Sequence, residues 1–166
     1  MLTPFLQDEA FPADVAHAAP GYLPLWWLGQ RGFLGQHADC PLLLDPYLSD
    51  SLTLKYATTD KPHVRMTARV VEPEQLDFVD VVTSTHSHTD HLDAETLLPL
   101  AAANPALALV IPEANRDQVV ERLQCDPLWP LGLNAGETVE VAGFRLTGVP
   151  AAHEQLEIDD AGRHRF

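Results

Sequence analysis

Short apolar runs, each followed by a polar or turn-forming segment, dominate the pattern of this 166-residue chain. Such runs predict short, largely buried strands near residues 23–28, 42–44, 78–82 and 107–111. The third run continues through β-branched residues as far as Thr85. Residues 138–141 and 144–149 flank Gly143, which predicts a hairpin.

Helical signals lie between these strands. Residues 93–103 open with Asp93, a residue type that caps helices, and continue with leucine and alanine. Pro99 is expected to kink or shorten this helix. Asn115 could cap a second helix that ends near Arg122. The first twenty residues predict an irregular arm or a short helix, and residues 46–75 predict a long connection that borders the active site. Strands and helices in this order favour a layered α/β fold.

A dense group of metal-binding side chains follows the third predicted strand. His86, His88, Asp90 and His91 form the pattern His-x-His-x-Asp-His. On an extended or tightly turned backbone, His86 and His88 project the same way and can share one metal ion, whereas Asp90 and His91 suit a second ion. A solvated histidine-rich loop is the alternative. The position at the carboxyl end of a strand, where ligand sites of layered α/β folds collect, favours a metal site.

The chain resembles the metallo-β-lactamase superfamily of metal-dependent hydrolases, and within it the L-ascorbate-6-phosphate lactonase-like group. The histidine motif is highly specific for the superfamily. Three further segments carry the resemblance, namely residues 25–33, residues 42–50 with Asp45, and residues 148–154 with His153. The fold that this resemblance implies is the four-layer αββα sandwich, of which the chain would form the N-terminal αβ half.

The same resemblance implies a two-metal site. His86, His88 and His153 would hold the first ion, and Asp90 and His91 the second, with Asp90 also the candidate catalytic residue. Asp45 is a candidate hydrogen-bond acceptor that orients a metal-binding imidazole, but it could equally cap the turn before Pro46. The remaining histidines are expected to be ordinary surface residues, namely His17, His37, His63 and His164.

The expected chemistry is hydrolysis. Two divalent ions, zinc or manganese with iron possible, would lower the pKa of a shared water, and the resulting hydroxide would attack a small ester, lactone or phosphoester. The superfamily also carries a later bridging aspartate and a final histidine, which would lie beyond Phe166. We therefore expect residues 1–166 to be one incomplete domain, completed by a C-terminal half or by a second copy. An inactive metal-binding remnant or an interaction subunit is the alternative.

The composition of the chain limits the classes of molecule that it is expected to bind. The net charge of −14 would repel nucleic acid at long range, so a small-molecule substrate is favoured. Basic residues come closest to forming a cluster at Lys61, His63, Arg65 and Arg69. We interpret this segment as a solvated loop, with phosphate binding as the alternative. Cys40 and Cys125 lack metal-binding or redox spacing, and no signal peptide or membrane-spanning run is evident, so a cytoplasmic location is expected.

Overall fold

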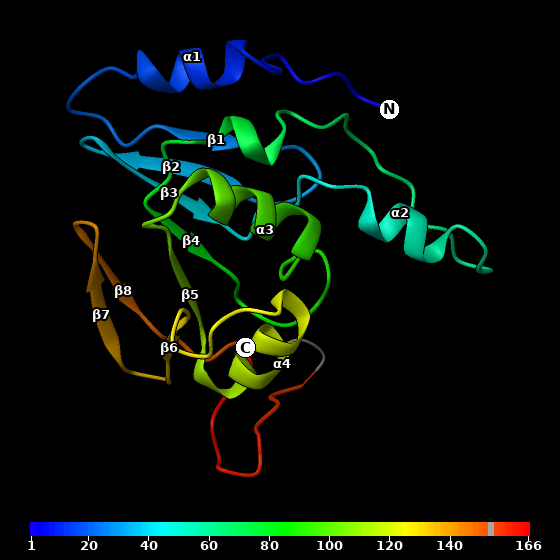
Figure 1. The fold of residues 1–166 in the computed structure, drawn as a ribbon, viewed down its shortest axis with the longest axis vertical. Coiled ribbons are helices and arrows are strands. Elements are labelled where there is room, and N and C mark those ends of the chain that lie inside the picture. Colours follow the sequence, from blue (N-terminus) through cyan, green and yellow to red (C-terminus); the bar gives the residue numbers. More distant parts are fainter. Residues whose placement is uncertain (153–154) are drawn as a thin grey trace.

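The structure is a computed structural model that describes residues 1–152 and 155–166. Its helices are α1 Ala10–Ala16, α2 Ser51–Tyr56, α3 Ala94–Ala103 and α4 Arg116–Leu123, with short 3₁₀ turns η1 Pro73–Gln75 and η2 Glu113–Asn115. Its strands are β1 Leu25–Trp27, β2 Phe33–His37, β3 Cys40–Leu44, β4 Val81–Thr83, β5 Ala108–Pro112, β6 Leu131–Leu133, β7 Thr138–Val141 and β8 Phe144–Thr147. Figure 1 shows α1 at the β1 end of the molecule and α4 near the opposite end.

Six strands of the described chain form one sheet in sequence order, β1 to β6. The first three strands pair antiparallel, whereas β3, β4, β5 and β6 run parallel. Leu44 at the end of β3 pairs with Thr83 at the end of β4, and Thr83 pairs with Val110 of β5. The loops that leave these parallel strands therefore emerge at the same edge of the sheet. This register places Asp45 beside the start of the histidine loop.

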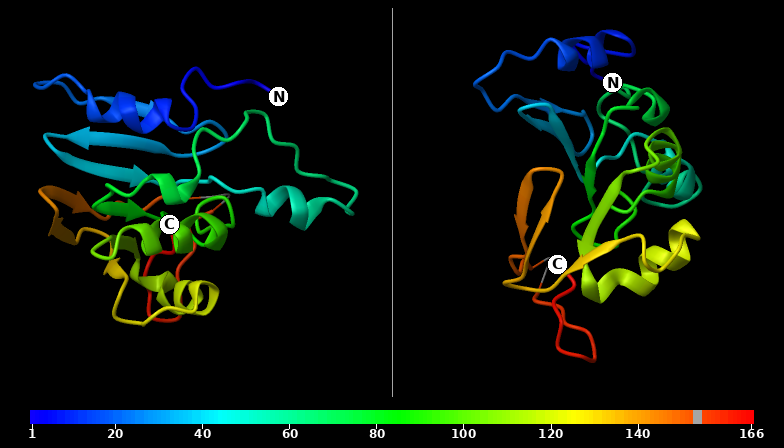
Figure 2. Two further views of the ribbon diagram at one scale, coloured as in Figure 1. Left: turned by 45° about the horizontal axis from the view of Figure 1, so that its top comes forward. Right: turned by 60° about the vertical axis from the view of Figure 1, so that its left-hand side comes forward.

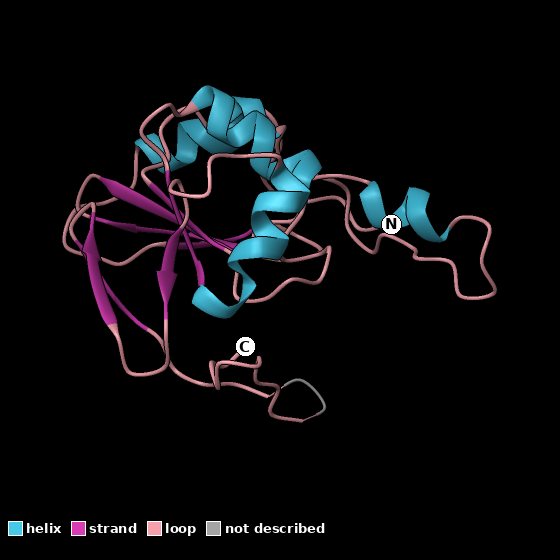
Figure 3. Ribbon diagram, turned by 60° about the horizontal axis from the view of Figure 1, so that its bottom comes forward, coloured by secondary structure: helices cyan, strands magenta, loops and turns pink. Residues whose placement is uncertain are grey.

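Three helices, α1, α3 and α4, cover one face of the sheet. Figure 2 shows α3 and α4 on one side of the strands, and Figure 3 shows α2 standing apart from the sheet. Leu43, Val82 and Leu109 point into this layer, where they join buried side chains of α1, α3 and α4 in the main core. The alternation of side chains along a strand explains the division, because every second residue of each strand faces the helices.

The hairpin of β7 and β8 covers part of the opposite face. Val141, Phe144 and Leu146 pack there against Leu42, Val81 and Val110. Ala142 and Gly143 at the hairpin turn both have positive φ, 45° and 79°, as tight hairpin turns require. The expected hairpin is therefore present.

An incomplete domain would leave one sheet face uncovered, but the hairpin shields that face over β3 to β6. In the described chain, the exposed part lies over β1, β2 and the end of β3. Register puts Trp27, Phe33 and Leu44 side by side there, with side chains 56%, 40% and 37% exposed.

The layered α/β class is confirmed, but several element boundaries differ from those expected. The strand expected from residue 78 begins at Val81, because Val79 N donates instead to Asn104 Oδ1 at 2.9 Å. The structure does not shorten α3 at Pro99, since the helix continues to Ala103. Glu95, whose carbonyl loses its helical partner to Pro99, is exposed and can bond to water. The sequence reasoning missed β6 and α2. No helix in the described part of the chain is long and apolar enough to cross a membrane.

Candidate metal centre

The histidine loop begins where β4 ends and is folded back on itself. Ser84 N donates to Val110 O at 3.0 Å, which continues the sheet by one residue. His91 N and Leu92 N both donate to His88 O, at 3.0 and 2.8 Å, so the chain turns tightly between the histidines. Arg122 of α4 also binds the loop, because its Nη1 donates hydrogen bonds to Ser87 O and Leu92 O. The loop is thus held by the sheet and by a helix.

This turn gathers the imidazoles. The ring centroids of His86 and His91 lie 3.9 Å apart, and those of His86 and His88 lie 4.7 Å apart. The potential ligand atoms of Asp45, His86 and His91 all lie within 4.8 Å of one another. One ion could therefore contact all three side chains, because its bonds to nitrogen and oxygen are about 2.0–2.2 Å long.

Asp45 organises this cluster from the end of β3. It is buried and has a positive φ of 45°. Its Oδ1 accepts hydrogen bonds from Thr85 N at 3.0 Å and Thr83 Oγ1 at 2.9 Å, and its Oδ2 accepts one from the Thr85 hydroxyl. The side-chain contacts of Asp45 in the described chain thus point to the histidine loop rather than to the turn before Pro46.

The contact between Asp45 and His91 sets the orientation of one imidazole. Asp45 Oδ2 lies 2.5 Å from His91 Nδ1, and a carboxylate can only accept, so Nδ1 carries the proton. In the neutral ring, His91 Nε2 then carries no proton and has a lone pair that can bind a metal ion. This atom lies 3.8 Å from Asp90 Oδ2. His91 Nε2 and Asp90 Oδ2 are thus close enough for one ion to contact both, while Asp90 Oδ2 pairs with Arg31 Nε at 2.7 Å.

The electrostatics keep these donors in the forms that bind metal. Burial alone would raise the pKa of Asp45, but hydrogen bonds from His91 and Thr85 outweigh it and hold that pKa below its ordinary value. Burial, together with the neighbouring His91 and His88, lowers the pKa of His86 to about 4. At neutral pH the cluster therefore offers a neutral imidazole beside a charged carboxylate. This donor set fits zinc or manganese.

The predicted ligands are brought together as far as the structure describes them. His86, His88, Asp90 and His91 share the loop, and Asp45 lies against it. The expected first ion also included His153, which lies outside the described residues. The tightest described group, Asp45 with His86 and His91, crosses the expected division between the two ions. The assignment of each residue to an ion remains a prediction.

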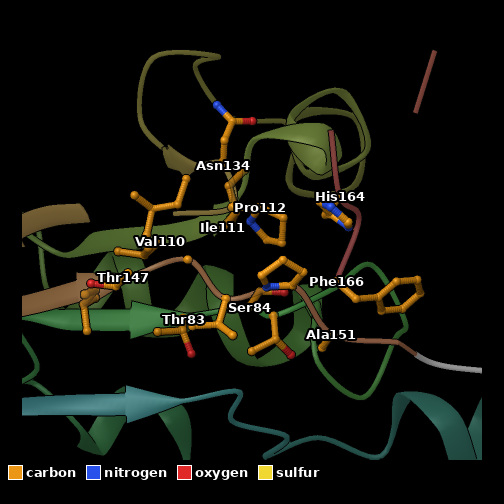
Figure 4. Close-up of a pocket in the computed structure, with 17 residues that line it drawn as sticks. Thr83, Ser84, Val110, Ile111, Pro112, Asn134, Thr147, Ala151, His164 and Phe166 are labelled. Carbon is orange, nitrogen blue, oxygen red and sulfur yellow. The ribbon is translucent and has the colours of Figure 1, made fainter. Parts of the chain in front are cut away.

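A large cleft opens beside the loop. Its volume is about 1010 Å³, and its lining includes Asp45, His88, Asp90 and His91 together with Trp27 and Phe33. A second, mainly apolar cavity of about 320 Å³ lies between the strand ends, the hairpin and the C-terminal segment (Figure 4). The two cavities share Thr83 and Thr85, so the strand end that leads into the metal loop borders both.

Three further side chains line the cleft that were not predicted to bind metal, namely Arg31, Lys55 and His63. Lys55 and His63 belong to residues 46–75, the connection expected to border the active site, and Arg31 lies in the β1–β2 turn. The solvated loop favoured for Lys61, His63, Arg65 and Arg69 is wrong at Arg65, which is not on the surface. Arg65 is buried and donates to Thr67 O and Ser49 O, while Arg69 pairs with Glu72 at 2.5 Å.

Comparison with known proteins places this geometry in a family. The Beta-lactamase superfamily domain matches residues 24–165, which is most of the chain. The chain belongs to the β-lactamase superfamily. The superfamily part of the expected resemblance is thereby confirmed, and with it the fold of the sheet and its helical layer.

Individual relatives of this superfamily chain are distant. A UPF0173 metal-dependent hydrolase of Methanopyrus kandleri is 29% identical over 135 residues, which cover 81% of this chain and 49% of the relative. A UPF0173 metal-dependent hydrolase of Methanosarcina mazei is also 29% identical, over 140 residues that cover 84% and 50%. The chain thus spans about half the length of the curated relatives it matches.

A solved structure supports the fold of this superfamily chain. CmlA, a diiron β-hydroxylase from Streptomyces venezuelae, superposes with a TM-score of 0.60 at 18% identity, covering 88% of this chain and 27% of CmlA. At that identity the likeness concerns the fold alone.

Proposed function

We propose that this protein is a metal-dependent hydrolase of a small ester, lactone or phosphoester. The observation that carries the proposal is the cluster of Asp45, His86 and His91, with His88 and Asp90 beside it, at the wall of an open cleft. The names of the UPF0173 relatives support the same reaction class. The resemblance to the L-ascorbate-6-phosphate lactonase-like group, expected from the sequence alone, favours a lactone or phosphorylated substrate.

The residues of the chain have separable tasks in this proposal. His86 and His88 bind through neutral ring nitrogens, and His153 is proposed as their third partner. Asp90 and His91 hold a second ion, and Asp90 also orients the attacking water. When bound there, zinc, manganese or iron would lower the pKa of that water and stabilise negative charge on the substrate oxygen. Asp45 holds the Nδ1 proton of His91, so that Nε2 stays directed at the centre.

Removal and return of metal tests this function. The purified protein is treated with a chelator, dialysed and assayed on a panel of lactones, carboxylic esters and phosphodiesters. We expect hydrolysis of at least one class to disappear after chelation and to return with added zinc or manganese. Hydrolysis that persists in metal-free protein, or its complete absence at full metal loading, would contradict the proposal. Asp90→Asn, which should be inactive, serves as a control for contaminating hydrolases.

A further inference from the structure

We propose that Lys55 and Arg31 form a binding subsite for an oxyanion, a carboxylate or phosphate group on the substrate, at the wall of the metal cleft. The subsite deepens the proposed hydrolase function and rests on it for its biological meaning. Both cations line the cleft of about 1010 Å³ that holds the metal-binding residues. They arrive from different elements and reach adjacent residues of the loop, Thr89 and Asp90.

Lys55 is a cation without an acidic partner in the described chain. Its Nζ donates to Thr89 Oγ1 at 3.3 Å and lies 5.3 Å from the ring centroid of Tyr56, and no described carboxylate lies within 4.0 Å of it. Acidic residues outnumber lysine and arginine by 24 to 10 in this chain. A lysine in such a chain would readily find a carboxylate on the surface, yet Lys55 faces the cleft, where a ligand can supply the missing negative charge.

Arg31 is held in place by a rigid turn. Gly29 and Gly32 flank the position with φ of +91° and +82°, and a Cβ on Gly32 would lie 2.6 Å from Asp45 O. Gln30 Oε1 accepts a hydrogen bond from Met66 N at 2.7 Å, which fastens the turn from the other side. Arg31 Nε then meets Asp90 Oδ2 at 2.7 Å, with its side chain still 49% exposed.

The charges that line the cleft leave one cation open to an anion even before metal binds. Asp90 pairs with Arg31, and Asp45 accepts hydrogen bonds from Thr85 and the His91 ring, so Lys55 is the positive charge of the lining without a described carboxylate beside it. A divalent ion bound at Asp90 and His91 would make the cleft more positive still. A positive cleft within a chain of net charge −14 attracts anions locally while the remaining surface repels them.

The size of the cleft leaves room for a substituent away from the reacting bond. Trp27 and Phe33 also line it and provide an apolar wall for the body of the substrate. We therefore expect a substrate in which the bond to be hydrolysed and a separate oxyanion are joined by a small organic skeleton.

Anion binding to metal-free protein tests the subsite without any hydrolysis. Inorganic phosphate and acetate are titrated calorimetrically into chelator-treated protein at pH 8, where an ordinary imidazole is neutral. We expect at least one of the two anions to bind the wild type. The affinity of the protein for that anion should fall about ten-fold in Lys55→Gln, because one charge-assisted hydrogen bond is lost. The affinity should fall further in the double variant Lys55→Gln with Arg31→Gln. The anion that binds more tightly identifies the substituent.

Matched variants complete the test. Lys61→Gln removes an exposed lysine that does not line the cleft, and Arg145→Gln removes an exposed arginine paired with Glu140 on the hairpin. Both should bind the anion as the wild type does. The subsite is overturned if neither anion binds the wild type, or if Lys55→Gln and Lys61→Gln bind equally well. Anion binding that depends on Lys55 in a protein without hydrolytic activity would count against the hydrolase proposal and leave the subsite standing.

Discussion

Among single residues, the sequence predicts a site residue best when the other residues of the site lie next to it in the chain. His86, His88, Asp90 and His91 are found from six consecutive residues, because their spacing alone brings them onto one loop. Asp45 is 46 residues from His91, and it became a candidate through family resemblance; its 2.5 Å contact with His91 depends on the pairing of β3 with β4. Arg31 lies in segment 25–33, which carries the family resemblance, and Lys55 in the connection expected to border the active site, but only the folded chain shows that both reach the same loop.

Asp45→Asn tests how the imidazole is oriented. The carboxamide removes the charge that holds the proton on His91 Nδ1, so His91 can adopt the other tautomer or turn. We expect zinc affinity to fall by about 10–100-fold, the usual effect of losing such an orienting partner. Calorimetric titration measures it, with Asp39→Asn in the exposed β2–β3 turn as the control. A loss of thermal stability with unchanged zinc affinity would instead assign Asp45 to the turn alone.

At the scale of elements, the apolar runs locate strands better than they locate strand ends. The runs near residues 42–44 and 107–111 become β3 and β5, while the run from residue 78 pairs with its neighbours only from Val81. The side chain of Asn104 accepts a hydrogen bond from Val79 N. This contact joins residues far apart in the chain, so the hydrophobic periodicity does not predict it. The strand β6 is only three residues long and contains Gly132, which explains why its pattern was too weak to identify.

The β1–β2 turn offers a test at this scale. Gly32→Ala adds a Cβ at 2.6 Å from Asp45 O and 2.8 Å from Pro46 Cα, whereas Gly21→Ala adds one at similar positive φ with nothing within 4 Å. Gly21→Ala should therefore lose only the backbone preference, about 1–2 kcal/mol. Gly32→Ala should lose about 1–3 kcal/mol more through the clash. Denaturant unfolding of both variants measures the difference, and equal losses would show that the turn is not packed against Asp45 as described.

At the scale of the whole molecule, the sheet has two unequal faces. One is covered by helices, and the other is shared between the hairpin and a strip of exposed apolar residues that includes Trp27, Phe33 and Leu44. The expectation that a second copy or a further half of the domain covers this strip remains a prediction, as do the domain bounds 1–166 and the cytoplasmic location. The sequence could identify the superfamily, but the shielding by β7 and β8 depends on how the hairpin folds back.

Zinc titration of the whole chain shows whether the histidine loop is a metal centre. Three proteins are compared, namely the wild type, the double variant His86→Ala with His88→Ala, and the double variant His17→Ala with His37→Ala, which removes two exposed histidines away from the loop. We expect tight binding by the wild type and by the second variant. The first variant should lose tight binding yet unfold cooperatively when metal-free, because its changes lie on a loop beyond the core. Zinc binding by the first variant that equals that of the wild type would contradict the account.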